Sequence, residues 1–98
     1  MGRPRKRRRI GFLPTSTVFK PQAIPVSELE HINLSIDELE SIRLTALESL
    51  TQSQAATRMD VHQSTLQRIL VRANRKIADA LINNKAIEIE QAEKTRSY

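Results

Sequence analysis

Apolar residues recur at helical spacing through the second half of this 98-residue chain. At about 100° per residue, one arc of the segment from Gln63 to Ile82 collects its apolar positions: Leu66, Ile69, Leu70, Ala73, Ile77, Ala80 and Leu81. The opposite side collects polar and basic positions: Ser64, Arg68, Arg72 and Arg75. The pattern therefore predicts one long amphipathic helix with a buried face and a solvated face.

Two shorter helices are predicted upstream, and each begins with the residue spacing of a capping box. Ser35 with Glu38, and Thr51 with Gln54, can each exchange two hydrogen bonds between side chain and backbone. The second of these helices is expected over residues 52–58. The first is expected to bury a stripe of apolar residues: Ile36, Leu39, Ile42, Ala46 and Leu50.

Short β-prone segments flank the helices. Residues 17–20 can form an edge strand, and residues 86–90 alternate apolar and polar side chains as a half-buried strand does. We expect the two to pair as a two-stranded ribbon packed on the helices, because such a ribbon alone is marginally stable. Asn84 can end the long helix in a left-handed conformation. The spacing of Ser27 and Glu30 predicts one further helical turn.

Composition narrows the class of protein. The chain is 39% hydrophobic but only 3% aromatic, so its core must be aliphatic, and 98 residues allow one domain. It has no cysteine, which excludes disulfides and thiolate metal sites. No apolar run reaches the roughly 18 residues of a membrane span, and the basic N-terminus lacks the apolar core of a secretory signal. We therefore expect a mainly α, cytoplasmic protein with no membrane partner.

Charge is distributed unevenly along the chain, whose net charge is +5. Residues 1–9 carry six bases and no acid, which predicts a disordered basic arm before a single domain at residues 10–90 and a frayed tail at residues 91–98. Residues 28–48 contain six acids and one base, whereas residues 61–78 contain four bases and no acid. This segregation predicts an acidic face and a basic face that suits a polyanion. An ordinary solvated surface is the alternative.

The residues between positions 52 and 71 have the spacing of a helix-turn-helix. Ala55 and Ala56 are small enough for two helices to cross closely, and Asp60 can adopt the positive φ that the connecting turn requires. Four apolar residues around the turn can fill the space between the helices: Met59, Val61, Leu66 and Ile69. We therefore predict a three-helix core containing a helix-turn-helix, with the small ribbon beside it.

In such a motif the N-terminal part of the second helix enters the major groove of DNA. We expect base reading from the outward side chains there: Gln63, Ser64, Gln67 and Arg68. Phosphate contacts are expected from residues at the helix start and farther along it: His62, Thr65, Arg72, Arg75 and Lys76. Ordinary polar surface is the alternative for Gln67 and Arg68. His62 could instead cap the helix, and Ser64 with Gln67 is a rival cap.

The N-terminal arm offers a second mode of contact. Its Gly-Arg-Pro core among basic residues resembles an AT-hook, whose extended backbone lies in a narrow minor groove. An arm that binds phosphates without sequence preference is the alternative. The candidate residues are Arg3, Arg5, Lys6, Arg7, Arg8 and Arg9.

Catalytic and metal chemistry have little support in the sequence. His31 and His62 are too few and too isolated to form a zinc site. Two of the three acids Asp37, Glu38 and Glu40 could be read as a catalytic pair, but their place at a helix start favours capping and interaction with the helix dipole. A glycine-rich phosphate loop and a nucleophile motif are both absent. We expect no enzyme activity, no metal and no cofactor.

Several segments resemble a family of small prokaryotic proteins known as domain of unknown function 134. They are RPRK at residues 3–6, FKPQAIP at 19–25 and LSIDELESIRL at 34–44, with further matches at 54–56, 63–65, 68–70, 76–81 and 84–86. The resemblance covers residues 2–90. It implies a DNA-binding protein whose helix-turn-helix is similar to the fourth region of bacterial sigma factors.

The chain departs from the family pattern at Asp60, where the family tends to have Gly, and at His62, where it tends to have Ser or Thr. Both positions bear on the angle of the recognition helix. Some relatives carry a further C-terminal domain resembling one that binds an iron–molybdenum cofactor. We do not expect that role here, because the chain ends before such a domain.

The sequence thus predicts sequence-specific binding of double-stranded DNA by helix and arm, as a transcription regulator on the nucleoid. A homodimer formed through the ribbon or the acidic first helix would set two recognition helices about 34 Å apart. One alternative is a module that docks on the transcription machinery, such as RNA polymerase, through residues 28–48. The other is structured-RNA binding; single strands are disfavoured because only Phe12, Phe19 and Tyr98 could stack on bases.

Overall fold

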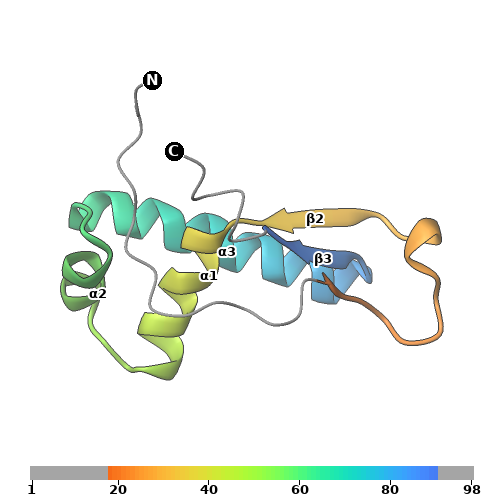
Figure 1. Cartoon of the computed structure of the whole chain (residues 1–98), viewed down its shortest axis with the longest axis horizontal. Helices are drawn as coiled ribbons and strands as arrows, with labels where there is room; N and C mark the ends of the chain where they lie inside the picture. Colours follow the sequence, from red (N-terminus) through yellow and green to blue (C-terminus); the bar gives the residue numbers. More distant parts are fainter. Residues whose placement is uncertain (1–17, 91–98) are drawn as a thin grey trace, which may run out of the picture.

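The structure, a computed structural model, describes residues 18–90 of the chain. In chain order they form β1 (Val18–Phe19), the 3-10 turn η1 (Val26–Glu28), β2 (His31–Leu34), α1 (Ile36–Ile42), the π-helical segment η2 (Arg43–Leu47), α2 (Gln52–Met59), α3 (Gln63–Asn83) and β3 (Ala86–Ile89). α3 runs along the longest dimension of Figure 1, with α2 beside its N-terminal end. The mainly α fold with a small sheet is confirmed. The predicted arm at residues 1–9 and tail at residues 91–98 lie outside the described residues.

Both helix starts predicted from capping boxes are confirmed. The Glu38 N–H donates to Ser35 Oγ at 3.1 Å, and the Ser35 N–H donates to Glu38 Oε1 at 2.9 Å. Thr51 and Gln54 exchange the equivalent pair of bonds at 3.1 and 2.9 Å. The turn predicted from Ser27 and Glu30 exists, but it begins after Pro25 and no side chain caps it.

The segment after α1 does not bury the apolar stripe that regular helical spacing predicts. The N–H of Glu48 donates to the carbonyl of Arg43, five residues earlier, at 3.0 Å. A turn closed by such a bond holds more residues than an α-helical turn, so later side chains are rotated away from their expected directions. Ala46 is therefore exposed, and Leu44 takes the place in the core.

The sheet has three strands, in the order β1-β3-β2, rather than the two that were predicted. The expected pairing of β1 with β3 is confirmed as antiparallel, with Phe19 opposite Ile87. β2 was not predicted, and it pairs with β3 in parallel, with Leu34 opposite Ile89. All three α-helices lie between these two strands in the chain, so their pairing depends on how the helices pack.

Two packed regions share α3. Near its N-terminal half, η2, α2 and α3 enclose one apolar cluster: Leu44, Ala55, Ala56, Met59, Leu66 and Leu70. Along its C-terminal half α3 lies beside the sheet (Figure 1), and Ala80, Leu34 and Ile89 are buried there. The prediction that Leu81 lies on the buried face is wrong. Leu81 is about 100° further round the helix than Ala80, and it is 72% exposed.

The connection between α2 and α3 is a tight turn that ends α2 in a left-handed residue. Asp60 has φ 61° and ψ 47°, as the sequence predicted. Its N–H donates to the carbonyl of Thr57 at 3.1 Å, and the Val61 N–H donates to that of Ala56 at 3.0 Å. These two bonds form a Schellman motif, and Val61 packs against the apolar cluster. The turn therefore fixes where α3 begins relative to α2.

No helix within residues 18–90 combines the length and apolar character needed to cross a membrane. Asn84 ends α3 at φ 56°, as predicted.

The left-handed conformation of Asp60 leads to a stability prediction. Replacing it by Gly should raise the free energy of unfolding by about 0.5–1 kcal/mol, because Gly reaches positive φ without a steric cost. Asp60→Val should lower the same free energy by about 1 kcal/mol or more. Urea unfolding followed by circular dichroism measures both. His62→Gly is the matched control, since His62 has φ −69° and should gain nothing from Gly. A loss of stability in Asp60→Gly would contradict the prediction.

Candidate nucleic-acid interface

The first two turns of α3 present polar side chains to solvent. Gln63, Ser64, Gln67 and Arg68 are all exposed, and Thr65 is half-buried. Arg68 Nη2 lies 3.5 Å from Thr65 Oγ1, which is a weak contact that leaves most of the guanidinium free. Behind this surface Leu66 is fully buried in the apolar cluster, so the core holds these turns in place.

His62 occupies the cap position of α3 by its extended backbone, but its side chain makes no capping hydrogen bond. The first hydrogen bond of α3 runs from the Leu66 N–H to the His62 carbonyl at 3.0 Å. The rival start at Ser64 is wrong, because α3 begins at Gln63. His62 is exposed beside the polar surface.

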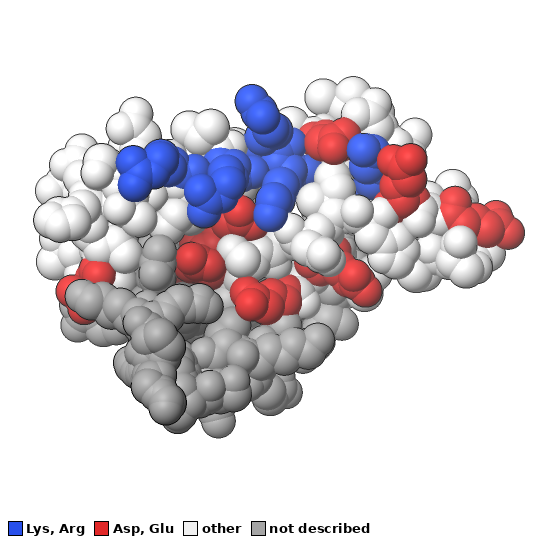
Figure 2. All heavy atoms as spheres, turned by 90° about the horizontal axis from the view of Figure 1, so that it is seen from above, with Lys and Arg blue, Asp and Glu red and all other residues white. Residues whose placement is uncertain are grey.

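Basic side chains continue this surface along α3. Arg68, Arg72 and Arg75 are exposed and Lys76 is half-buried. Figure 2 shows basic side chains gathered in a row across the face seen from above. Arg75 has no hydrogen-bond or ion-pair partner within residues 18–90. The basic residues of α3 that we predicted to contact phosphate thus differ in their exposure and in whether they already have a partner in the described part of the chain.

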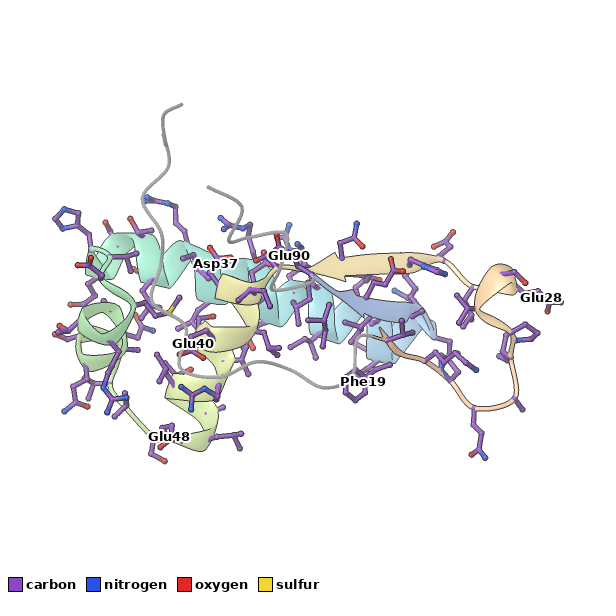
Figure 3. All side chains as sticks on the ribbon, viewed as in Figure 1. Phe19, Glu28, Asp37, Glu40, Glu48 and Glu90 are labelled. Atoms are coloured by element: carbon purple, nitrogen blue, oxygen red, sulfur yellow. The ribbon has the colours of Figure 1, made fainter. Side chains whose placement is uncertain are left out.

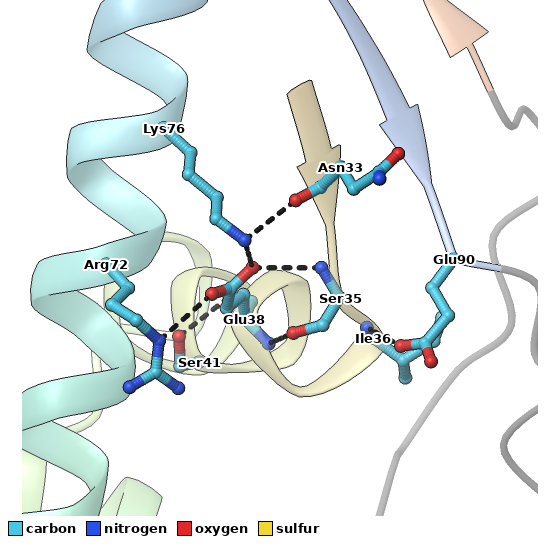
Figure 4. A network of polar contacts seen from close by, with 8 residues as sticks. All are labelled: Asn33, Ser35, Ile36, Glu38, Ser41, Arg72, Lys76 and Glu90. Atoms are coloured by element: carbon cyan, nitrogen blue, oxygen red, sulfur yellow. Dashed lines mark hydrogen bonds and ion pairs between the residues drawn. The ribbon is translucent and has the colours of Figure 1, made fainter. Parts of the chain in front are cut away.

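Glu38 is the buried partner of this row. Only 2% of Glu38 is exposed, yet its carboxylate accepts from Lys76 Nζ at 2.9 Å and from Arg72 Nε at 3.3 Å (Figure 4). It also accepts the capping bond from Ser35. Lys76 Nζ donates in addition to the Asn33 carbonyl at 2.7 Å. One carboxylate therefore connects α1, β2 and α3.

The network leaves Arg72 and Lys76 with different numbers of N–H groups available to a ligand. Arg72 contacts Glu38 through Nε, and its side chain is 56% exposed, so its terminal nitrogens point to solvent from a fixed position. Lys76 uses two of its three N–H groups inside the protein. Arg72 is thus suited to contact a phosphate, whereas Lys76 mainly supports the fold.

The pKa of Glu38 reflects this surrounding. Burial acts to raise the pKa, but the hydrogen bond from the Ser35 N–H and the hydrogen bond and charge of Lys76 act against it, with a further hydrogen bond from Arg72. The balance lowers the pKa below its ordinary value. Glu38 is therefore an anion under neutral conditions, and the pair with Arg72 and Lys76 is ionic.

The acids of residues 28–48 do not form one acidic face. Glu38 and Glu40 are both only 2% exposed. Glu40 holds Arg43 through two hydrogen bonds of 2.8 and 3.0 Å. Figure 3 shows Glu28 at the far end of the molecule from Glu48. The expected segregation is thus right for the bases of α3 and wrong for the acids.

Two features of the surface were missed in the sequence. The position of Arg72 depends on Glu38, 34 residues away in the chain, and no local pattern signals that pair. Arg58 is exposed in the last turn of α2, and its place just before the turn could have marked it as a further contact. The predicted residues of the arm lie outside the described residues.

Comparisons with known proteins identify relatives without an assigned activity. The model of the family described as "Protein of unknown function DUF134" matches residues 1–97. A "UPF0251 protein" of Prosthecochloris aestuarii is 53% identical over 89 residues, which are 91% of this chain and 57% of that relative. A "UPF0251 protein" of Halothermothrix orenii is 48% identical over 90 residues, which are 92% of this chain and 67% of the relative.

A third relative with the same name, from Methanosarcina mazei, is 53% identical over 89 residues, which are 90% of this chain and 54% of the relative. The chain thus spans between about half and two thirds of the length of these three relatives. No solved structure matches the chain.

The Glu38 network predicts a stability loss that depends on pH. Glu38→Gln keeps a capping side chain but leaves Lys76 without its counter-ion, and should lower the free energy of unfolding by roughly 2–3 kcal/mol at pH 7. Because the folded pKa of Glu38 is lowered, the ionic stabilisation is present above the ordinary value of 4.5 and is lost as pH falls through the folded value. The difference between wild type and variant in urea unfolding should therefore shrink below about pH 4.

The matched control is Glu48→Gln. Glu48 also pairs with an arginine, Arg43 at 3.3 Å, but its side chain is 51% exposed. We expect its effect to stay within about 0.5 kcal/mol at either pH. A deficit of Glu38→Gln that stays the same from pH 7 to well below pH 4 would show that the ionic pairs contribute nothing.

Proposed function

This chain belongs to the DUF134 family of proteins of unknown function, and we propose that it binds double-stranded DNA through a helix-turn-helix formed by α2, the Asp60 turn and α3. One observation carries the proposal. The two turns of α3 that directly follow the tight turn expose four polar side chains, while Leu66 from the same turns is locked in the core. A rigid helix with a polar outer surface at its N-terminal end suits insertion into the major groove.

We assign base reading to the side chains at the start of α3 that have suitable hydrogen-bonding groups. Gln67 can bond an adenine edge through two atoms of its amide, and Arg68 can bond guanine in the same bidentate way. Gln63 and Ser64 lie one turn earlier on the same exposed surface. His62 and Thr65 flank them, at positions where contacts with the backbone of DNA are expected.

Phosphate contacts follow along α3. Arg72, held by Glu38, and Arg75, without a partner in the described residues, present charge one to two turns beyond the reading surface. The six bases of residues 1–9 supply further charge for phosphates or the minor groove. We therefore propose recognition by helix plus arm, as expected of a transcription regulator in the cytoplasm.

Docking on the transcription machinery through residues 28–48 is the weaker proposal. Two of the six acids there, Glu38 and Glu40, are buried and paired within the chain. Of the remaining acids, Glu28 lies at the far end of the molecule from Asp37 and Glu48, so these three offer no compact charged surface (Figure 3). Binding of structured RNA would use the same basic side chains. It gives no role, however, to the exposed polar side chains at the start of α3, which we call the reading surface.

Loss of the reading surface should abolish sequence preference. Fragments selected from random duplex DNA by the wild-type chain should share a motif, and Gln67→Ala/Arg68→Ala should bind that motif at least tenfold more weakly, since each bidentate contact contributes about 1–3 kcal/mol. Fluorescence anisotropy with the selected duplex and with a scrambled one measures the effect.

Lys20→Ala/Gln22→Ala is the matched control for this pair. It also removes one cation and one amide from exposed positions, but in the loop between β1 and η1, beyond the sheet and far from the start of α3. We expect its affinity for the motif to stay within twofold of wild type. Selection without any enriched motif, or equal binding by both double variants, would refute base reading.

Salt dependence tests the electrostatic part separately. Each phosphate neutralised contributes about −0.9 to the slope of log affinity against log salt, so arm and helix together should give a slope of about −5 or steeper. Arg72→Gln should make that slope shallower by about 1 on any duplex, without changing the preferred motif. Affinity that hardly changes between 50 and 200 mM salt would be incompatible with the proposed function.

A further inference from the structure

The outer face of α3 becomes apolar in its C-terminal half. Val71, Leu81 and Ile82 are 57%, 72% and 76% exposed, respectively, and Ala78 between them is exposed too. At about 100° per residue Val71, Ala78 and Ile82 lie on the arc opposite the buried Ala73 and Ala80, and Leu81 lies at the border of that arc. Large aliphatic side chains clustered on one exposed helical face are unusual in a monomer and mark an interaction surface.

A second feature of this face is its charged edge. Arg75 and Asp79, four residues apart, lie side by side along the same border of the apolar arc. Arg75 has no partner within residues 18–90. Asp79 receives Asn83 Nδ2 at 2.6 Å and Lys85 Nζ at 3.1 Å, one on each carboxylate oxygen, so each oxygen can accept another bond.

We propose that this face, defined by Val71, Ala78, Leu81 and Ile82, pairs with the same face of a second copy of the chain in an antiparallel, two-fold arrangement. In an antiparallel pair related by a two-fold axis, the corresponding edges of the two helices lie on the same side of the pair and face each other there. A two-fold axis level with Ile77 then sets Arg75 of each copy level with Asp79 of the other. The same axis places Val71 level with Asn83, one residue from Ile82, across the contact. The small Ala78 near the centre lets the helices approach.

The charge pattern selects the antiparallel arrangement. In a parallel pair the edge with Arg75 and Asp79 would face the opposite edge of the partner helix, which carries no charged residue. The antiparallel pair gains two ion pairs that are related by the two-fold axis. This contact differs from the ribbon and the acidic first helix, which the sequence had suggested for dimerisation.

The dimer has a consequence for DNA that rests on the proposed function. Gln67 lies ten residues before Ile77, so at about 1.5 Å per residue the two Gln67 positions are separated by roughly 30 Å along the helix pair. This is close to the 34–36 Å between successive major grooves on one side of DNA. The antiparallel pair also turns the edges that carry Arg68 and Arg72 toward the same side, so that Arg72 can contact phosphate while Arg75 pairs with the second copy. The dimer itself does not require DNA and is tested without it.

Sedimentation equilibrium of the full chain without DNA tests the dimer. The average mass should rise with concentration from 11.2 kDa toward twice that value. Leu81→Ser/Ile82→Ser should weaken the association at least tenfold, and circular dichroism should show an unchanged fold because both side chains are exposed. Leu47→Ser is the matched control, since Leu47 is 80% exposed in η2, outside this face. Its association should equal that of wild type.

A charge exchange tests the orientation. Arg75→Glu should weaken the dimer by setting acids against acids, and Arg75→Glu/Asp79→Lys should restore it, because only an antiparallel pair matches these positions with each other. A chain that stays at 11.2 kDa at all concentrations overturns the proposal, including the case in which other residues of the same chain cover the face. A dimer insensitive to Leu81→Ser/Ile82→Ser, or not restored by the exchange, overturns it as well. None of these outcomes depends on DNA binding.

Discussion

The buried carboxylate of Glu38 is the contact on which the arrangement of the helices and the sheet depends. It accepts the hydrogen bond from the Ser35 N–H that completes the capping box of α1, and it binds Lys76 and Arg72 of α3. Lys76 continues the network to the carbonyl of Asn33 in β2. Close by, the Ile36 N–H donates to Glu90 Oε1 at 2.9 Å, which ties the start of α1 to the end of β3 (Figure 4). Breaking such a buried pair is costly, so it restricts α1 and the sheet to one position on α3.

This position divides α3 into two functional halves. In the N-terminal half, α2 and η2 cover the inner face around Leu66, and the outer face exposes the polar residues that we assign to DNA. In the C-terminal half, the sheet lies against the helix and Ala80 is buried, and the outer face exposes Leu81 and Ile82, which we assign to a second copy. Because one continuous helix carries both surfaces, pairing of two copies would fix the distance between their reading surfaces.

The candidate interface could be predicted in part from the sequence. The exposed residues of α3 followed from helical spacing, because the apolar residues on the other side of the helix had to face the core. The difference between Arg72 and Lys76 could not be predicted. Both have the same charge and a similar place on the helix, but the carboxylate between them comes from α1, whose packing the local sequence does not encode. The burial of Glu38 and Glu40 was hidden for the same reason.

The sequence by itself determined the features that arise within a few residues. The capping boxes at Ser35 and Thr51, the left-handed turn at Asp60 and the end of α3 at Asn84 each depend on hydrogen bonds and backbone preferences of near neighbours. Only the tertiary structure decided the parallel pairing of β2 with β3, the core position of Leu44 and the exposure of Leu81. These depend on which distant segment covers a given surface, and that choice is made by packing of the whole chain.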